Sequence, residues 1–310
     1  MLRRLAIRYV GRDDLRELRD CANTLRSVIR SAWANRKRRP VPVEDIIRGL
    51  QEVGVEPGDI LLLHSGIGTL SRSGPSAVNN FQSSSYGREV LDGVLGLLGP
   101  KGTLLVPTAP TTLAYDMATR PETFDPRNAP AGTGLIPNLV LSLPDSVRSP
   151  VPWQNITAVG YRAKELIEGH EQCGPYAMGP GSPWQRLGQM GGKVALLAVD
   201  HDRSSTVHVP ENNHPNEYPR AVFFNKPHRF YYRAEDGSER TVDSVLHAVR
   251  WADGDIVRFC RSVDMRHKIY REHPLGRTKV IGFSAQAQYE AFLTEMESNR
   301  CLFDSEFRLP

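Results

Sequence analysis

The hydrophobic pattern of the chain changes near residue 40. Over residues 12–34, apolar side chains recur at spacings of three and four with arginines on the opposite face, which predicts an amphipathic helix. The segment NRKRRPVP that follows ends in two prolines and is typical of a linker. The pattern therefore predicts a basic helical N-terminal extension over residues 1–40 and a separate α/β domain over residues 41–310.

Two helix–strand pairs open the second part. Residues 43–54 have helical periodicity and precede a short apolar run, ILLLHS, at 60–65. A second helix at 87–99 precedes a second apolar strand at 102–108. The Ser-, Asn- and Gly-rich residues 71–86 between them predict a mobile loop. Helices that alternate with wholly apolar strands are typical of an α/β sheet whose strands are buried on both faces.

The later part of the chain adds further elements. Residues 156–170 predict a strand followed by a helix, and residues 191–200 predict a third buried strand. Apolar and polar residues alternate over 220–245, where EDGS predicts the turn of a β-hairpin. A final helix is predicted at 285–296, whereas residues 109–134 show little periodicity. We expect one domain in which strands and helices are interleaved.

The composition says little about the fold but more about the compartment and the membrane partners expected for the protein. The 310 residues are 40% hydrophobic and 24% charged, which is ordinary for a globular protein. No apolar run reaches the roughly 18 residues that a membrane span needs, and the start of the chain lacks the pattern of a signal peptide. The four cysteines, at positions 21, 173, 260 and 301, are far apart and are expected to be free thiols. We expect a cytoplasmic protein without a membrane partner.

The net charge of +4 is unevenly distributed. Residues 1–40 contain 12 of the 39 lysines and arginines but only 4 of the 35 acidic residues, so the rest of the chain is mildly acidic. An acidic body suits a cationic amine, although total charge is weak evidence about one pocket. No aromatic residues are interleaved with the basic run, so nucleic acid is not the expected partner. Two roles are open for the extension: a solvated helix, or a docking surface for an acidic partner.

Polar residues stand at the ends of the predicted strands. His64 and Ser65 end the first strand and are followed by GIGTL, and Thr108 ends the second strand. Ligands of α/β proteins gather at the carboxyl ends of strands, and small residues there let backbone amides approach phosphate or carbonyl oxygens. These positions are candidate binding residues, although a polar loop start would look the same.

The third strand leads into HDRSSTVHVPENNH, which contains a candidate catalytic pair. His208 and Glu211 are three residues apart and can share one face of a helical turn; Pro210 limits that turn to the start of a helix. A carboxylate beside an imidazole raises its basicity and fixes its tautomer. The pair therefore predicts a general base that could take a proton from an amine.

Two other chemistries are open to the same segment. His208, Glu211 and His214 could form a metal site of a hydrolase, but HxxExxH is not the zinc-binding HExxH pattern, so we expect no metal. Ser204, Ser205 or Thr206 could form an acyl-enzyme with His208, but no GxSxG motif supports it. The remaining histidines, His247 among them, are assigned to surface or core.

The order of these motifs resembles the aminoglycoside 3-N-acetyltransferase family. The similar stretches run from about residue 43 to residue 300 and are HSGIGTL, GLLGPKGTLLVPT, ETFDPRNAPAGTGLIPN, VRSPVP, HEQCGPYAMGPGSPWQRLGQMGGKVALLAVD and STVHVPE. The resemblance implies a single-domain α/β fold with a central mixed β-sheet flanked by helices, and an acyltransferase domain over residues 41–310. It also implies acetyl-CoA or another acyl-CoA as co-substrate without a metal, a small-molecule amine as acceptor, and direct transfer in a ternary complex. A homodimer is compatible with it.

The resemblance also assigns roles to residues at matching positions. His208 is the implied base and Glu211 its support. The implied residues near the CoA thioester and its pantetheine arm are His64, Ser65, Thr108, Arg148 and Ser149. On the acceptor side, Asp125 is implied near the amine and Ser182 in the pocket wall.

Three departures from the family pattern bear on the acceptor. Val151 stands where the family has the histidine of Arg-Ser-x-His-Pro, the segment 71–86 is longer than usual, and the extension 1–40 is atypical. These changes are expected to alter the acceptor pocket more than the reaction. The acceptor could be an aminoglycoside, in antibiotic resistance, or an amine of antibiotic or other secondary-metabolite biosynthesis. A catalytically silent binding protein on the same fold is the alternative.

Overall fold

The structure is a computed structural model that describes residues 39–71, 81–111, 117, 122–248 and 255–303. The helix predicted over residues 12–34, and with it the basic extension, lies outside the described residues, as does most of the segment 71–86. Within the described residues, no helix has both the length and the apolar character needed to cross a bilayer.

A seven-stranded mixed sheet forms the centre of the molecule, in the order β4-β5-β2-β1-β6-β10-β9. Its strands are β1 (Ile60–Ser65), β2 (Thr103–Pro107), β4 (Val147–Arg148), β5 (Ile156–Gly160), β6 (Lys193–Leu197), β9 (Arg271–Leu275) and β10 (Thr278–Ser284). Strand β1 is parallel to both β2 and β6, and the other pairs are antiparallel. The mixed central sheet is confirmed, and the three apolar runs predicted as buried strands form its parallel centre.

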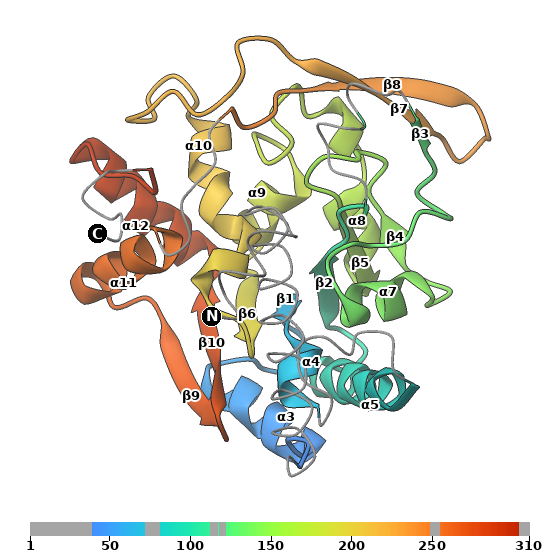
Figure 1. Cartoon of the computed structure of the whole chain (residues 1–310), viewed down its shortest axis with the longest axis vertical. Helices are drawn as coiled ribbons and strands as arrows, with labels where there is room; N and C mark the ends of the chain where they lie inside the picture. The colour runs from blue at the N-terminus through green and yellow to red at the C-terminus, as the bar shows by residue number, and fades with distance from the viewer. Residues whose placement is uncertain (1–38, 72–80, 112–116, 118–121, 249–254, 304–310) are drawn as a thin grey trace, which may run out of the picture.

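Helices cover both faces of this sheet (Figure 1). The α-helices of the described residues are α3 (Val43–Glu52), α4 (Ile67–Leu70), α5 (Phe81–Leu98), α7 (Leu135–Leu141), α8 (Ala163–Ile167), α9 (Pro183–Gln189), α10 (Val209–Asn213), α11 (Asp255–His267) and α12 (Ala285–Glu297). Alternate side chains of β1 point to opposite faces: Leu61 and Leu63 pack in the core with α3, α5 and α7, whereas Leu62 packs in the core with α8 and α9. Because both faces are covered, the central strands must be apolar throughout, which explains their sequence pattern.

A second, three-stranded sheet, in the order β3-β7-β8, lies at the end of the molecule opposite α3 and α5 (Figure 1). Strands β7 (His228–Arg233) and β8 (Glu239–Ser244) form the predicted hairpin, and the Asp236 carboxylate accepts hydrogen bonds from the Ser238 amide and hydroxyl in the turn. Strand β3 (Thr123–Phe124) pairs in parallel with β7. The hairpin prediction is confirmed, but its pairing with β3 had no sequence signal.

The prediction of a loop over residues 71–86 is wrong at its C-terminal end, because α5 already begins at Phe81. Serines are weak helix formers, but the helix is anchored here by tertiary contacts. Tyr86 is buried, and its hydroxyl donates a 2.6 Å hydrogen bond to the Val41 carbonyl. Among the described residues, Cys173, Cys260 and Cys301 form no disulfide, as predicted.

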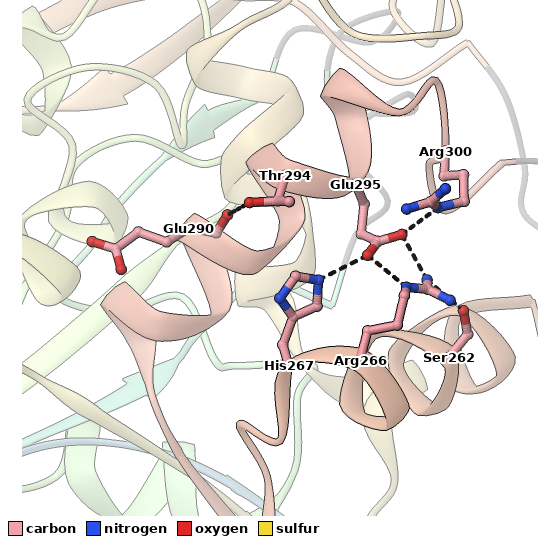
Figure 2. Close-up of polar contacts among 7 residues, drawn as sticks. All are labelled: Ser262, Arg266, His267, Glu290, Thr294, Glu295 and Arg300. Atoms are coloured by element: carbon pink, nitrogen blue, oxygen red, sulfur yellow. Dashed lines mark hydrogen bonds and ion pairs between the residues drawn. The ribbon is translucent and has the colours of Figure 1, made fainter.

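A buried ionic cluster joins α11 to α12 (Figure 2). The Glu295 carboxylate is fully buried and accepts two hydrogen bonds from Arg266, at 2.8 and 2.6 Å, and one each from His267 at 2.8 Å and Arg300 at 2.5 Å. Burial opposes ionisation of Glu295, but these hydrogen bonds outweigh it and lower its pKa to about 2. We refer to these four residues as the Glu295 cluster.

Candidate active site

The site is built at the edge where the three parallel strands end. His64 and Ser65 close β1, and Thr108 follows β2. The chain leaving β6 forms two short 3-10 helices, at His201–Arg203 and Ser205–His208, and then α10. Gly66 fits against this segment because a Cβ there would lie 2.7 Å from the Ala198 carbonyl oxygen. The parallel strands therefore bring the β1 end and the segment after β6 together, as expected for a ligand site in an α/β sheet.

His208 and Glu211 form the predicted pair. His208 directly precedes α10, and Pro210 and Glu211 both lie in the first turn of that helix. The Nδ1 atom of His208 lies 2.9 Å from Oε1 of Glu211, and the two side chains are 7% and 0% exposed. The predicted contact and its position at the start of a helix are confirmed.

The pair fixes the chemistry of the imidazole. An ionised carboxylate can only accept, so Nδ1 of His208 carries the proton and Nε2 holds the lone pair of the neutral ring. Burial alone would raise the pKa of Glu211, but the imidazoles of His208 and His247 outweigh it and lower the pKa. Glu211 is therefore ionised at neutral pH, and Nε2 of His208 is the atom that can accept a proton.

A third residue, His247, completes the group. Its Nε2 lies 2.5 Å from the same Oε1 of Glu211, and its ring centroid is 5.1 Å from that of His208. In the sequence His247 is predicted to be a surface or core residue, because it lies 36 residues beyond Glu211 and belongs to no motif. We call His208, Glu211 and His247 the imidazole–carboxylate cluster.

The same cluster has the composition of a metal site, since its donor atoms lie within 4.8 Å of one another. Two ligands of one tetrahedral zinc ion are about 3.3 Å apart, given metal–nitrogen distances of about 2.0 Å. The contacts of 2.9 and 2.5 Å are shorter and match charge-assisted hydrogen bonds. His214, the other histidine considered for a metal, instead contacts the Tyr289 hydroxyl on α12 at 2.7 Å. We therefore assign the cluster as hydrogen-bonded.

His64, near the end of β1, contacts the segment that leads to His208. Its Nε2 accepts a 3.4 Å hydrogen bond from the Ser205 amide, and burial lowers its pKa to about 4, so the ring is neutral. On the other side of the same segment, the Thr206 hydroxyl contacts Ser204 at 2.9 Å and donates to Gln288 of α12 at 2.6 Å. These contacts hold the backbone before His208 from two directions.

A second group of predicted residues converges on Asn155. The Asn155 side-chain oxygen accepts hydrogen bonds from the Thr108 hydroxyl and from Nε of Arg148, both at 2.7 Å. Its amide nitrogen donates to the carbonyls of Ser149 and Val151 at 2.8 and 2.7 Å. We call Thr108, Arg148, Ser149 and Asn155 the Asn155 network. Sequence analysis missed Asn155, because no motif contains it.

Arg148 is engaged inside the protein. Besides Asn155, its guanidinium donates to the carbonyls of Thr108, Pro126 and Ala129, and it stacks 4.9 Å from the centroid of the Phe124 ring. Burial lowers its pKa to about 10, still far above neutrality. Its charge is therefore present, but its donors hold the loop after β3 against β4. A role for Arg148 in CoA binding stays a prediction.

Ser149 is equally constrained. Its hydroxyl lies 2.6 Å from Nδ1 of His170 and accepts a 3.0 Å hydrogen bond from the Val151 amide. The other ring nitrogen of His170 lies 2.6 Å from the Ala177 carbonyl, so it donates there and Nδ1 accepts from Ser149. Val151 is 2% exposed and packs in an apolar core with Phe230. The position that departs from the family pattern is thus filled by core packing.

The two residues predicted on the acceptor side have local structural contacts. Asp125 accepts hydrogen bonds from the Arg127 amide at 3.0 Å and from the Asn128 side chain at 2.9 Å, which close the turn after β3. Ser182 is fully buried and caps α9, accepting from the Gln185 amide at 3.3 Å. Among the hydrogen bonds and ion pairs of the described residues, none joins either side chain to the imidazole–carboxylate cluster, so their acceptor roles stay predictions.

The structure thus arranges the predicted residues in two groups. His64 contacts Ser205, in the segment that leads to His208, and Ser65 pairs with Leu197 at the end of β6, whereas Thr108, Arg148 and Ser149 belong to the Asn155 network. Trp153, two residues before Asn155, contacts the His247 ring edge-on at 6.1 Å and so lies between the two groups.

Fold and site together define an α/β protein with a buried histidine–glutamate pair at the carboxyl edge of a mixed sheet. The chain belongs to the aminoglycoside 3-N-acetyltransferase family, whose model matches residues 71–297, well over half of the chain. The family resemblance inferred from the sequence motifs is confirmed.

Two curated relatives illustrate the distance within the family. Aminoglycoside N(3)-acetyltransferase IV of Salmonella sp is 31% identical over 176 residues, which are 54% of this chain and 57% of that protein. Aminoglycoside N(3)-acetyltransferase VIII of Streptomyces fradiae is 28% identical over 207 residues, or 61% of this chain and 66% of that protein. The alignments thus span less than two thirds of either relative.

Solved structures support the fold. The crystal structure of aminoglycoside acetyltransferase AAC(3)-Xa superposes with a TM-score of 0.68 at 24% identity and covers 84% of this chain and 94% of that one. Aminoglycoside acetyltransferase AAC(3)-IVa gives a TM-score of 0.66 at 22% identity, covering 87% of this chain and 94% of that one. At these identities the likeness shows a shared fold, and it confirms the predicted mixed α/β architecture.

Proposed function

We propose that this protein transfers an acyl group from a CoA thioester to the amine of a small molecule, with His208 as general base. The observation that carries this proposal is the buried contact between Nδ1 of His208 and the ionised Glu211, which leaves the lone pair on Nε2 to accept a proton. A base of this kind contributes about 10²–10⁴-fold to the rate of a reaction that needs proton removal.

The chemistry follows from this arrangement. The amine nitrogen attacks the thioester carbonyl while its N–H proton passes to Nε2 of His208. The new C–N bond forms, the C–S bond breaks, and the departing CoA thiolate takes up a proton. The imidazolium that forms transiently is stabilised by the negative charge of Glu211. The Ser204 and Thr206 hydroxyls bond to each other and Thr206 also donates to Gln288, which argues against an acyl-enzyme at either of these two residues.

The strand-end residues are proposed to face the thioester. His64 and Ser65 lie beside the segment that carries the base, and the neutral His64 ring can face an uncharged ligand group without an unpaired charge. Backbone amides after His64 were expected to approach the carbonyl oxygen. The Gly66 amide is not available for this, because it donates to the Leu197 carbonyl at 2.9 Å. An oxyanion donor would therefore come from a later amide.

Relatives support the ligand classes. A structure of AAC-IIIb is a binary complex with CoASH, and AAC-VIa was solved bound to sisomicin. By analogy, CoA or acetyl-CoA is the proposed donor here, and an aminoglycoside-like or secondary-metabolite amine the proposed acceptor. A role in resistance or biosynthesis, a cytoplasmic location and a homodimer stay predictions.

The test is His208→Ala, assayed by release of CoA thiol from acetyl-CoA with a panel of amines. The variant should lose roughly 100-fold or more in turnover while calorimetry shows unchanged CoA affinity. His214→Ala is the matched control, because His214 lies six residues away and contacts Tyr289 rather than Glu211. It should stay within about tenfold of the wild type.

Three outcomes would count against the proposal. Full activity of His208→Ala would remove the base assignment. Binding of CoA without acyl transfer to any amine would favour a silent binding protein, the alternative that the Val151 departure suggests. One zinc ion per chain in the purified protein would favour a metal-dependent hydrolase.

A further inference from the structure

We propose that Gln288 is a positioning residue that fixes the segment leading to His208 against α12. The inference rests on the proposed function, because it concerns the geometry of the same base. Gln288 lies 82 residues beyond Thr206, its partner in that segment, and on a helix to which the sequence motifs assign no role.

The segment before His208 has little support of its own. It is a 3-10 helix of four residues, Ser205–His208, and the side chain of Ser204, which precedes it, makes no capping hydrogen bond. Hydrogen-bond geometry in 3-10 helices is poorer than in α-helices, so such a short helix depends on its neighbours. The position of His208 is therefore set by what the side chains of this helix contact.

Two of these side chains contact the pair of helices α11 and α12. Val207 is 1% exposed and packs in an apolar core with Phe259 of α11 and Phe292 of α12. Apolar packing is non-directional, so it does not by itself fix the rotation of the 3-10 helix. Thr206 is also buried, and its hydroxyl donates a 2.6 Å hydrogen bond to Oε1 of Gln288. This directional bond adds the alignment that the apolar contact lacks.

The Gln288 amide is held at its other end as well. Gln288 is 1% exposed, and its Nε2 donates a 3.0 Å hydrogen bond to the Tyr270 hydroxyl. That hydroxyl also hydrogen-bonds with the buried thiol of Cys260 on α11, and the Tyr270 ring contacts Phe283 of β10 edge-on at 4.9 Å. Rotation of the amide would leave buried polar groups unpaired, which costs free energy.

These hydrogen bonds form a chain with one direction. Because Thr206 donates its proton to Gln288, its oxygen accepts from the Ser204 hydroxyl, 2.9 Å away. We call Ser204, Thr206, Gln288 and Tyr270 the Gln288 relay. The relay joins the start of the 3-10 helix to the C-terminal helices. A buried chain in which each member is paired holds one geometry, because a shift of one member leaves the next unpaired.

The consequence is a selective effect on kcat. Methionine in place of Gln288 keeps nearly the same volume but leaves the Thr206 hydroxyl without its acceptor. The 3-10 helix must then move to pair this hydroxyl elsewhere, and Nε2 of His208 moves with it. A displacement of about 1 Å can lower a rate about 100-fold, so we expect kcat to fall about 10–100-fold. The affinity for CoA should be unchanged, because no member of the relay is proposed to contact it.

The experiment measures kcat, and KM for acetyl-CoA, in variants of the two central members of the relay. Gln288→Met and Thr206→Val should each lower kcat at an unchanged KM. Thr206→Ser keeps the hydroxyl and should retain the wild-type kcat. The double variant Thr206→Val/Gln288→Met should be no slower than the slower single variant, because both substitutions remove the same hydrogen bond.

Two controls separate positioning from stability. Gln286→Met is the matched control, because Gln286 lies on the same helix and donates to Glu290, and its kcat should match the wild type. Glu295→Gln breaks the Glu295 cluster of the same helix without touching the relay, and its kcat should also match the wild type. An equal loss of kcat in Glu295→Gln would overturn the inference, because destabilisation of α12 would then explain the effect of Gln288→Met.

A second measurement is independent of turnover. The Nδ1 proton of His208, which is donated to Glu211, has an NMR resonance that reports on the position of the ring. This resonance should shift in Gln288→Met and Thr206→Val but not in Thr206→Ser or Gln286→Met. Absence of acyl transfer by the wild type would refute the proposed function, while these spectra would still decide the role of Gln288. An unshifted resonance in Gln288→Met would overturn the inference, as would additive losses of kcat in the double variant.

Discussion

Replacing Glu295 with glutamine tests the ionic cluster that joins α11 to α12 (Figure 2). Glutamine has nearly the same shape but no charge, so Arg266, His267 and Arg300 would surround a neutral amide. Glu295 is itself fully buried. The perturbation therefore removes the carboxylate that Arg266, His267 and Arg300 share.

The magnitude follows from the depressed pKa of Glu295. The pKa falls from 4.5 to about 2, and each unit corresponds to about 1.4 kcal/mol, so the ionised form contributes about 3 kcal/mol to the free energy of unfolding at neutral pH. Arg266 and Arg300 are 38% and 34% exposed and can be rehydrated in the variant, which reduces the loss. We expect Glu295→Gln to lower the free energy of unfolding by about 2–3 kcal/mol.

The assay is urea unfolding of wild type and Glu295→Gln at pH 7, with Glu290→Gln as control. Glu290 is exposed on the same helix and contacts only Gln286, at 2.9 Å, through its described side-chain hydrogen bonds. The control should change stability by less than about 0.5 kcal/mol.

The pH dependence adds a second check. Because folding lowers the pKa of Glu295, its contribution is complete above about pH 4.5 and is lost as the pH falls toward 2. The difference between wild type and Glu295→Gln should therefore shrink over this range. A loss below about 1 kcal/mol at pH 7, or a difference that stays constant in acid, would refute the electrostatic reasoning.

Two further predictions concern the framework of the site. Gly66→Ala would place a Cβ 2.7 Å from the Ala198 carbonyl oxygen, so the backbone between β1 and β6 must move. We expect the free energy of unfolding in urea to fall by about 1–3 kcal/mol and the acyl-transfer rate to be lower. Unchanged stability would contradict the close approach. Asn155 is fully buried, and Asn155→Leu would remove the partner of Arg148 Nε and of the Ser149 and Val151 carbonyls. We expect the free energy of unfolding in the same assay to fall by at least about 2 kcal/mol. Unchanged stability would show that the Asn155 network is dispensable.

The sequence by itself determined those features whose cause is local. The runs at 60–63, 104–106 and 194–199 are continuously apolar, which is typical of strands covered on both faces. His208 and Glu211 are three residues apart, so the first turn of a helix is enough to bring them together. The hairpin between β7 and β8 follows from the EDGS turn and the flanking alternation.

The tertiary structure alone decided the features that join distant segments. His247 reaches Glu211 from 36 residues away, and Arg148 reaches Thr108 from 40 residues away. Neither contact leaves a periodic pattern, because each depends on how strands and loops are stacked. Helix α11 was not predicted either, since its charged residues pair with Glu295 only after α12 has packed against it. Local spacing thus specified the contact between His208 and Glu211, whereas the packing of distant segments specified what else surrounds the Glu211 carboxylate.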